Sequence, residues 1–157
     1  MDAPLALYIH WPFCVSKCPY CDFNSHVRDS VDMDQWQAAL LADMSYEAGL
    51  TRGRPLTSIF FGGGTPSLMP PTLVEALLVE AERLWGFAPG IEITLEANPS
   101  SVEAARFADL AAAGINRVSL GLQSLQDESL RRSPARRPRG CLRGPGIIAA
   151  RFPPHRT

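Results

Sequence analysis

The sequence predicts an α/β fold in which parallel strands alternate with helices. Four short, β-prone apolar runs are separated by segments of helical periodicity, and the connections between them are short. The runs are nearly continuous in apolar or small residues, which is typical of strands buried on both faces. Parallel strands joined by right-handed crossovers and ringed by helices form a (β/α) barrel, so we expect a partial TIM-type barrel of about four β/α units.

The predicted elements alternate regularly along the chain. The four strands are expected at residues 5–10, 58–61, 92–96 and 117–122. The first helix, over residues 34–48, follows an aspartate cap. It places four large apolar side chains on one face, namely Trp36, Leu40, Leu41 and Met44.

Further helices are predicted after the second, third and fourth strands. The segment 71–85 opens with a proline in its first turn and stops at Gly86. The segment 101–113 begins at a serine and stops at Gly114. A last helix is expected to start near Asp127.

The composition is that of a globular protein, with 46% hydrophobic and 20% charged residues among 157. All 16 acidic residues lie before residue 129, so residues 1–132 carry a net negative charge and make a poor nucleic-acid binder. The N-terminus lacks the pattern of a signal peptide, and no apolar run is long enough to span a bilayer. We therefore expect no nucleic-acid partner, no integral membrane segment and a cytoplasmic location.

The character of the sequence changes after Arg132. Residues 133–157 hold five prolines and six arginines but no acidic residue, and neither helical nor strand periodicity continues. We predict that residues 1–132 form the folded part. The tail is interpreted either as a disordered basic segment or as the product of a shifted reading frame near Ser133.

Three of the four cysteines lie within eight residues, spaced as C-x3-C-x2-C: Cys14, Cys18 and Cys21. This crowding indicates metal binding rather than disulfide formation. Soft thiolate ligands suit an iron–sulfur cluster or zinc. Three cysteines on a four-iron cluster would leave one iron open to a small ligand. Cys141 lies in the tail and is predicted not to be a ligand.

The motif Tyr8-Ile-His-Trp-Pro-Phe-Cys14, continuing through Lys17-Cys18-Pro-Tyr-Cys21-Asp-Phe-Asn-Ser-His, resembles the radical S-adenosylmethionine (SAM) superfamily. The residues between and around the cysteines resemble those of the HemW-type haem chaperones and their relatives, the oxygen-independent coproporphyrinogen III oxidases. The resemblance implies a [4Fe–4S] cluster on the three cysteines, with SAM chelated at the open iron and cleaved to a 5′-deoxyadenosyl radical. The alternative is a non-enzymatic zinc site of three cysteines and a histidine, His10 or His26.

The cysteine loop and three further features, the glycine turn, Glu96 and Gln123, follow the ends of successive strands, where the active site of a β/α barrel lies. The resemblance implies that Gly63, Gly64 and Thr65 hold the methionine part of SAM, with glycines letting the backbone approach and present N–H groups. It also implies SAM contacts for Tyr8, Glu96 and Gln123. The alternatives are a structural glycine turn, an ion pair for the glutamate and a loop cap for the glutamine.

Two other side chains of the motif are open to a plainer interpretation. His10 is interpreted as structural or as a support for ligand-binding residues, and Lys17 as a solvated loop residue. Trp36 and Trp85 are expected to pack in the core.

Phe23 bears on the choice of activity within the family. In the oxidases that the chain resembles, an extra cysteine stands at this position, so phenylalanine favours the haem chaperone. The resemblance then implies haem as cargo and haem-accepting proteins as partners. The alternative is a coproporphyrinogen dehydrogenase-like enzyme of porphyrin biosynthesis.

The resemblance covers residues 4–132, which is less than a closed barrel of ~250 residues requires. We therefore expect a truncated form of the radical SAM barrel, inactive on its own. The haem acceptor, the electron donor and the oligomeric state are not indicated by the sequence.

Overall fold

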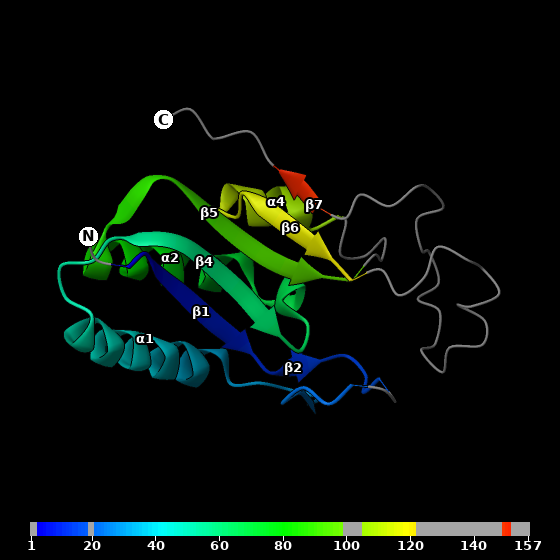
Figure 1. The fold of residues 1–157 in the computed structure, drawn as a ribbon. Coiled ribbons are helices and arrows are strands. Elements are labelled where there is room, and N and C mark those ends of the chain that lie inside the picture. Colours follow the sequence, from blue (N-terminus) through cyan, green and yellow to red (C-terminus); the bar gives the residue numbers. More distant parts are fainter. Residues whose placement is uncertain (1–2, 19–20, 99–104, 122–148, 152–157) are drawn as a thin grey trace.

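Four parallel strands form the centre of the molecule (Figure 1). The computed structural model describes residues 3–18, 21–98, 105–121 and 149–151. The parallel strands are β1 (Leu5–Trp11), β4 (Leu56–Gly63), β5 (Phe87–Ala97) and β6 (Arg117–Leu120). They lie side by side in chain order, so every crossover connects neighbouring strands. This confirms the predicted α/β fold of parallel strands alternating with helices, which is consistent with the expected partial barrel.

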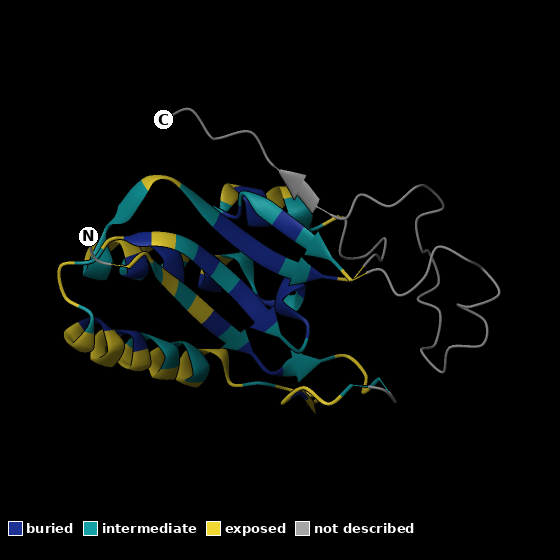
Figure 2. Cartoon of the chain, in the orientation of Figure 1, coloured by how far each residue is buried: buried dark blue, intermediate teal, exposed yellow. Residues whose placement is uncertain are grey.

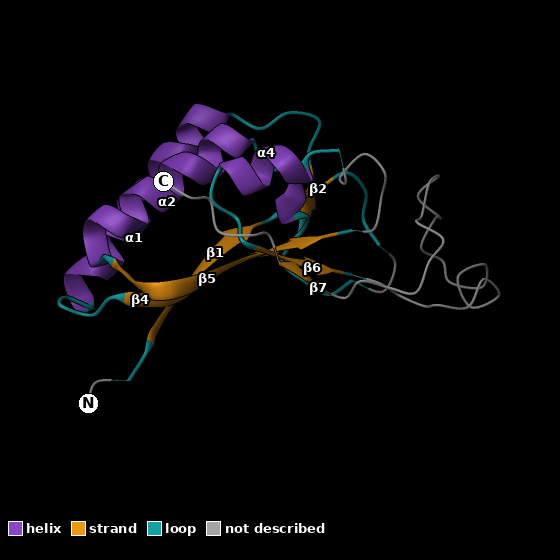
Figure 3. Cartoon of the chain, turned by 90° about the horizontal axis from the view of Figure 1, so that it is seen from above, coloured by secondary structure: helices purple, strands orange, loops and turns teal. Residues whose placement is uncertain are grey.

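Three helices cover one face of the sheet (Figure 3). They are α1 (Met33–Leu50), α2 (Pro71–Trp85) and α4 (Phe107–Ala112), and a short 3-10 helix, η1 (Pro66–Leu68), precedes α2. Asp32 caps α1 by accepting a hydrogen bond from the backbone N–H of Gln35 at 3.0 Å. Gly86 ends α2 with a φ of 71°, a conformation that glycine adopts without strain.

The hydrophobic core lies between the sheet and these helices. Phe61 on β4, Leu95 on β5 and Leu77 on α2 are fully buried. Alternate residues of the strands point into this core, and the central strands β4 and β5 are largely buried in Figure 2. Helix α1 packs less deeply: Met44 is buried and Trp36, Leu40 and Leu41 are half-buried, so its predicted apolar face is confirmed.

The other face of the sheet carries a row of side chains and no described helix (Figure 3). Tyr8, Phe60, Thr94 and Arg117 are successive neighbours across the four parallel strands. The rings of Tyr8 and Phe60 stack with centroids 6.1 Å apart, and Arg117 donates to Thr94 Oγ1 at 3.1 Å. The register of the strands therefore places these four side chains next to one another on the helix-free face.

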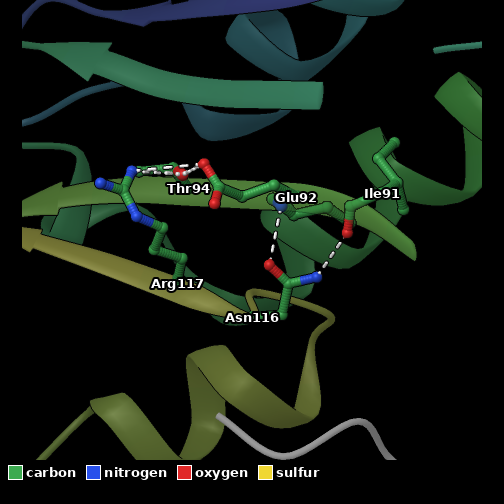
Figure 4. A network of polar contacts seen from close by, with 6 residues as sticks. Ile91, Glu92, Thr94, Asn116 and Arg117 are labelled. Carbon is green, nitrogen blue, oxygen red and sulfur yellow. Dashed lines mark hydrogen bonds and ion pairs between the residues drawn. The ribbon is translucent and has the colours of Figure 1, made fainter. Parts of the chain in front are cut away.

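A polar network joins the start of β6 to the middle of β5 (Figure 4). The Asn116 side chain accepts from the Ile93 N–H and donates to the Ile91 carbonyl, both at 2.8 Å. Beside it, Arg117 forms an ion pair with Glu92 at 3.4 Å. The Asn116 side-chain amide thus makes the hydrogen bonds that a backbone amide would make in a strand, and it extends the pairing of β6 with β5 by one residue.

Several element boundaries differ from the prediction. Strands β1, β4 and β5 are longer than expected, because parallel pairing continues past the apolar runs into glycine turns and polar residues, whereas β6 ends at Leu120, two residues before its predicted end. Helix α4 begins at Phe107 after a turn at residues 105–106, and the predicted start at Ser101 lies outside the described residues. Helix α2 matches its predicted bounds.

Three short strands were not predicted. Strands β2 (Phe13–Cys14) and β3 (His26–Val27) form a separate parallel pair. Strand β7 (Ala149–Arg151) pairs antiparallel with β6. It belongs to the Pro/Arg-rich tail, where no strand was expected, and it satisfies backbone groups at an edge that β6 would otherwise leave open. The rest of residues 133–157 and the helix expected near Asp127 lie outside the described residues.

Candidate functional site

The cysteine loop lies at the carboxyl edge of the sheet, where the arrowheads of the parallel strands point in Figure 1. It leaves β1 at Trp11, and its two ends are tied together where β2 pairs with β3. The His26 N–H donates to the Pro12 carbonyl at 2.6 Å, and the Cys21 N–H donates to the Cys18 carbonyl at 3.0 Å. These bonds close the segment 12–26 into a compact loop that carries all three motif cysteines.

The three motif cysteines are reduced and half-buried. Their thiols are thus accessible from the carboxyl edge yet belong to a loop fixed by backbone hydrogen bonds. Among the described residues, no three histidine, cysteine, aspartate or glutamate side chains lie close enough together to hold a single metal ion. Three soft thiol donors on one short loop fit an iron–sulfur cluster, in which each cysteine binds a different iron.

The glycine turn after β4 packs directly against this loop. The Gly64 N–H donates to the Trp11 carbonyl at 2.6 Å, and the Thr65 N–H donates to the Phe13 carbonyl at 3.0 Å. A Cβ atom on Gly64 would lie only 2.8 Å from Cys14 Sγ. Gly63 has a φ of 116°, where only glycine is unstrained. The turn therefore requires glycine because the cysteine loop approaches it.

These contacts correct one part of the sequence interpretation. The turn was expected to present its N–H groups to a ligand, but those of Gly64 and Thr65 are already donated to the cysteine loop. The Thr65 side chain is also committed, because its Oγ1 donates to Cys14 Sγ at 3.6 Å. The structural role that was the alternative for the glycine turn is thus established, and SAM contacts of Gly63, Gly64 and Thr65 stay a prediction.

Tyr8 and Glu96 lie on the helix-free face of the sheet, close to the same edge. The pKa of the Tyr8 phenol is raised, first by its partial desolvation and second by the negative charge of Glu96. Glu96 occupies the penultimate position of β5, and its neighbour on β6 is Ser119. Two residues predicted from separate strands are therefore close enough to interact electrostatically.

His10 connects Tyr8 to the cysteine loop. Its Nε2 lies 3.0 Å from the Asn24 carbonyl oxygen, which can only accept, so this nitrogen carries the proton. The Nδ1 atom is then the acceptor for the Tyr8 hydroxyl at 3.4 Å. His10 thus supports the loop rather than pointing away from it, which agrees with the interpretation as a structural or supporting residue.

Lys17 differs from the expectation of a purely solvated residue. Its side chain is exposed, but the ammonium donates to the Ser25 carbonyl at 3.2 Å and to the Ser25 hydroxyl at 3.4 Å. Ser25 itself is buried, and its Oγ lies 4.0 Å from Cys21 Sγ. Ser25 and Asn24 were not predicted as site residues, because single polar residues outside the cysteine spacing give no periodic or motif signal.

An aromatic cluster supports the base of the loop on the helix side. The Trp11 ring packs edge-to-face against Phe13, with centroids 4.9 Å apart, and Phe13 packs against Trp36 of α1 at 5.1 Å. Trp11 is 2% exposed. Because Phe13 immediately precedes Cys14, this cluster connects the first cysteine to the packing of α1.

Two predicted residues are not placed by the structure. Gln123 and Cys141 lie outside the described residues. The last described residue before Gln123 is Gly121, whose N–H donates to the Ala97 carbonyl at 2.9 Å. The chain therefore leaves β6 beside the end of β5, next to Glu96.

No helix in the described part of the chain is long and apolar enough to cross a membrane.

Comparison with known proteins identifies similar chains. The model of the Radical SAM superfamily matches residues 8–143. The chain is 48% identical over 130 residues to "Heme chaperone HemW" of Escherichia coli, a match that covers 82% of this chain and 34% of that protein. It is 43% identical over 125 residues to the mitochondrial "Radical S-adenosyl methionine domain-containing protein 1" of Bos taurus, covering 80% and 28% respectively.

One solved structure has the same fold. It is the coproporphyrinogen III oxidase HemN from Escherichia coli, which is described as a radical SAM enzyme. The TM-score is 0.71 at 32% sequence identity, and the match covers 82% of this chain and 30% of that chain. The chain thus spans about a third of the length of the relatives that it matches.

Proposed function

This chain belongs to the radical SAM superfamily, and on that basis we propose that it binds a [4Fe–4S] cluster and SAM and acts as a haem chaperone. Membership of the family implies the cluster and SAM. The ligands that we propose for the cluster are Cys14, Cys18 and Cys21. The haem cargo, the haem-accepting partners and a cytoplasmic location are parts of the proposal that the chain's similarity to HemW proteins supports.

The observation that carries the proposal is the docking of the cysteine loop on the glycine turn. Two backbone hydrogen bonds and a close contact between Gly64 and Cys14 Sγ hold the loop against the end of β4. The thiols are thereby fixed at the edge where the β/α connections of a barrel converge. A cluster held by Cys14, Cys18 and Cys21 would supply the electron for the reductive cleavage of SAM.

The residues proposed to contact SAM lie beside this loop. The Glu96 carboxylate can accept hydrogen bonds from an amine or from ribose hydroxyls, and it is near enough to Tyr8 to raise the pKa of the phenol. Tyr8 is 57% exposed on the helix-free face, so its ring is available to a ligand. Gln123 is proposed as a third contact from the chain that follows β6.

The second candidate is an oxygen-independent coproporphyrinogen III oxidase. The structural likeness to HemN favours it, whereas the higher identity to HemW proteins favours the chaperone. Phe23, which is 64% exposed, stands where the oxidases of this family have a further cysteine. We therefore place the chaperone first.

Anaerobic reconstitution tests the cluster. The wild-type chain should take up about four irons and four sulfides with a visible charge-transfer band. Replacing Cys14, Cys18 and Cys21 by alanine should abolish this absorbance, whereas the control Cys141→Ala should retain it. One bound zinc and no visible absorbance would contradict the cluster. Haem titration and coproporphyrinogen turnover, measured on the same sample, then separate the chaperone from the oxidase.

A further inference from the structure

Two buried hydroxyl groups lie beside sulfur atoms of the cysteine loop. Thr65 Oγ1 donates to Cys14 Sγ at 3.6 Å, and Ser25 Oγ lies 4.0 Å from Cys21 Sγ. Thr65 is 7% exposed and Ser25 is 6% exposed, so both hydroxyls are shielded from solvent. Two of the three proposed cluster ligands therefore have a potential hydrogen-bond donor from the protein.

The Thr65 hydroxyl is directed at sulfur although a common alternative is close by. Thr65 is the N-cap of η1, and a threonine at such a position usually accepts a hydrogen bond from a backbone N–H of the helix. Here the side chain makes no cap hydrogen bond. The Thr65 N–H is donated to the Phe13 carbonyl at 3.0 Å, which holds the residue against the cysteine loop. The hydroxyl proton is thus available to Cys14.

The Ser25 hydroxyl is oriented by Lys17. An ammonium group has donors and no acceptor, so Ser25 Oγ must be the acceptor of the 3.4 Å contact with Lys17 Nζ. Lys17 also donates to the Ser25 carbonyl at 3.2 Å, which fixes it over this residue. With a lone pair occupied in this way, the Ser25 proton is free to point at Cys21 Sγ.

We propose that Thr65 and Ser25 donate hydrogen bonds to two cluster-ligating sulfurs and raise the reduction potential of the [4Fe–4S] cluster. The inference rests on the proposed function, because it requires the cluster. Reduction adds one electron and therefore negative charge, so donors aimed at the sulfurs stabilise the reduced cluster more than the oxidised cluster. The effect is strengthened by burial, because a hydroxyl excluded from solvent is not screened by water.

The test is an anaerobic redox titration of the loaded full chain, without SAM, followed by electron paramagnetic resonance. Thr65→Val removes the hydroxyl at nearly constant shape, and the matched control Thr65→Ser keeps it. At a fixed applied potential, the ratio of oxidised to reduced cluster should rise about five- to tenfold in Thr65→Val, as expected for one lost hydrogen bond. A tenfold rise corresponds to about 59 mV for a one-electron couple. Thr65→Ser should stay near the wild type.

A second pair of variants tests the other hydroxyl independently. Ser25→Ala should lower the potential in the same direction, and Lys17→Met should do so by removing the group that orients Ser25. The control Thr57→Val deletes a hydroxyl that bonds to the Leu5 carbonyl, far from the loop at the start of β4. It should leave the potential unchanged.

The outcomes separate this inference from the proposed function. A wild-type chain that takes up no [4Fe–4S] cluster would overturn both. A loaded wild type whose potential is unaltered by Thr65→Val and by Ser25→Ala would overturn the inference alone. If Thr65→Val does not take up the cluster, the reduction potential of Ser25→Ala tests the inference. A lowered potential supports it, and an unaltered potential overturns it.

Discussion

At the scale of single residues, Gly64 has little freedom to change. Its hydrogen atom faces Cys14 Sγ and the Phe13 carbonyl oxygen, and a Cβ would approach each of them to 2.8 Å. Neither neighbour can move easily, because one belongs to the paired strand β2 and the other is a proposed cluster ligand.

Gly64→Ala is therefore expected to displace the cysteine loop. The cost of such overpacking is about 1–3 kcal/mol, and we expect the iron and sulfide bound per chain to fall several-fold. Gly49→Ala is the matched control, because a Cβ there meets no atom within 4 Å and lies in helix α1. Equal cluster content in the two variants would show that the close approach is not required.

Tyr8 gives a prediction about pH. Because its pKa in the folded chain is raised, the neutral phenol favours the folded state. The unfolded chain ionises first as the pH rises above about 10, so this contribution to stability is lost there. Glu96→Gln removes one cause of the shift and should lower the pKa of Tyr8. The tyrosinate absorbance of the wild type minus that of Tyr8→Phe measures this titration, and a pKa that is unchanged by Glu96→Gln would show that the two groups do not interact.

At the scale of elements, the sequence predicted helix α2 well and the loop strands not at all. A proline in the first turn and Gly86 at the end are strong local signals, and the structure uses both. Strands β2 and β3 have two residues each, and β3 is exposed, so neither apolar alternation nor length marks them. Their pairing is set by the closure of the cysteine loop, which is a tertiary contact.

The Asn116 network gives a prediction at the same scale. Asn116→Ala removes two hydrogen bonds between the connection to β6 and the backbone of β5. We expect a loss of about 1–3 kcal/mol in the free energy of unfolding, measured by chemical denaturation. Asn116→Asp keeps the oxygen but sets a charged acceptor against the Ile91 carbonyl oxygen, so it should lose at least as much stability as alanine. No difference between alanine and wild type would assign the pairing to the backbone alone.

At the scale of the whole molecule, the parallel sheet and the edge that carries the site were predictable. Strands that alternate with helices place their carboxyl ends together, so the cysteine loop, the glycine turn and Glu96 were expected at one edge. The contacts among them were not predictable, because hydrogen bonds such as that from Thr65 to Cys14 join residues 51 positions apart. The use of the turn's N–H groups by the loop is a result of that packing.

The hydrophobic core gives a prediction about stability. Leu95→Ala removes a fully buried side chain between the sheet and the helices and should cost about 2–5 kcal/mol in thermal or chemical denaturation. Val79 of α2 is 62% exposed, so Val79→Ala should change the free energy of unfolding by no more than about 0.5 kcal/mol. Comparable losses in both variants would mean that the core is not where the burial pattern places it.

The aromatic cluster beneath the cysteine loop has an optical consequence. Two of the three tryptophans, Trp11 and Trp36, pack around the phenylalanine that precedes Cys14. An iron–sulfur chromophore in the loop would absorb the light that these indoles emit. Their fluorescence should decrease as the cluster is loaded and recover when the iron is chelated. Tryptophan emission would therefore report how much of the protein holds its cluster.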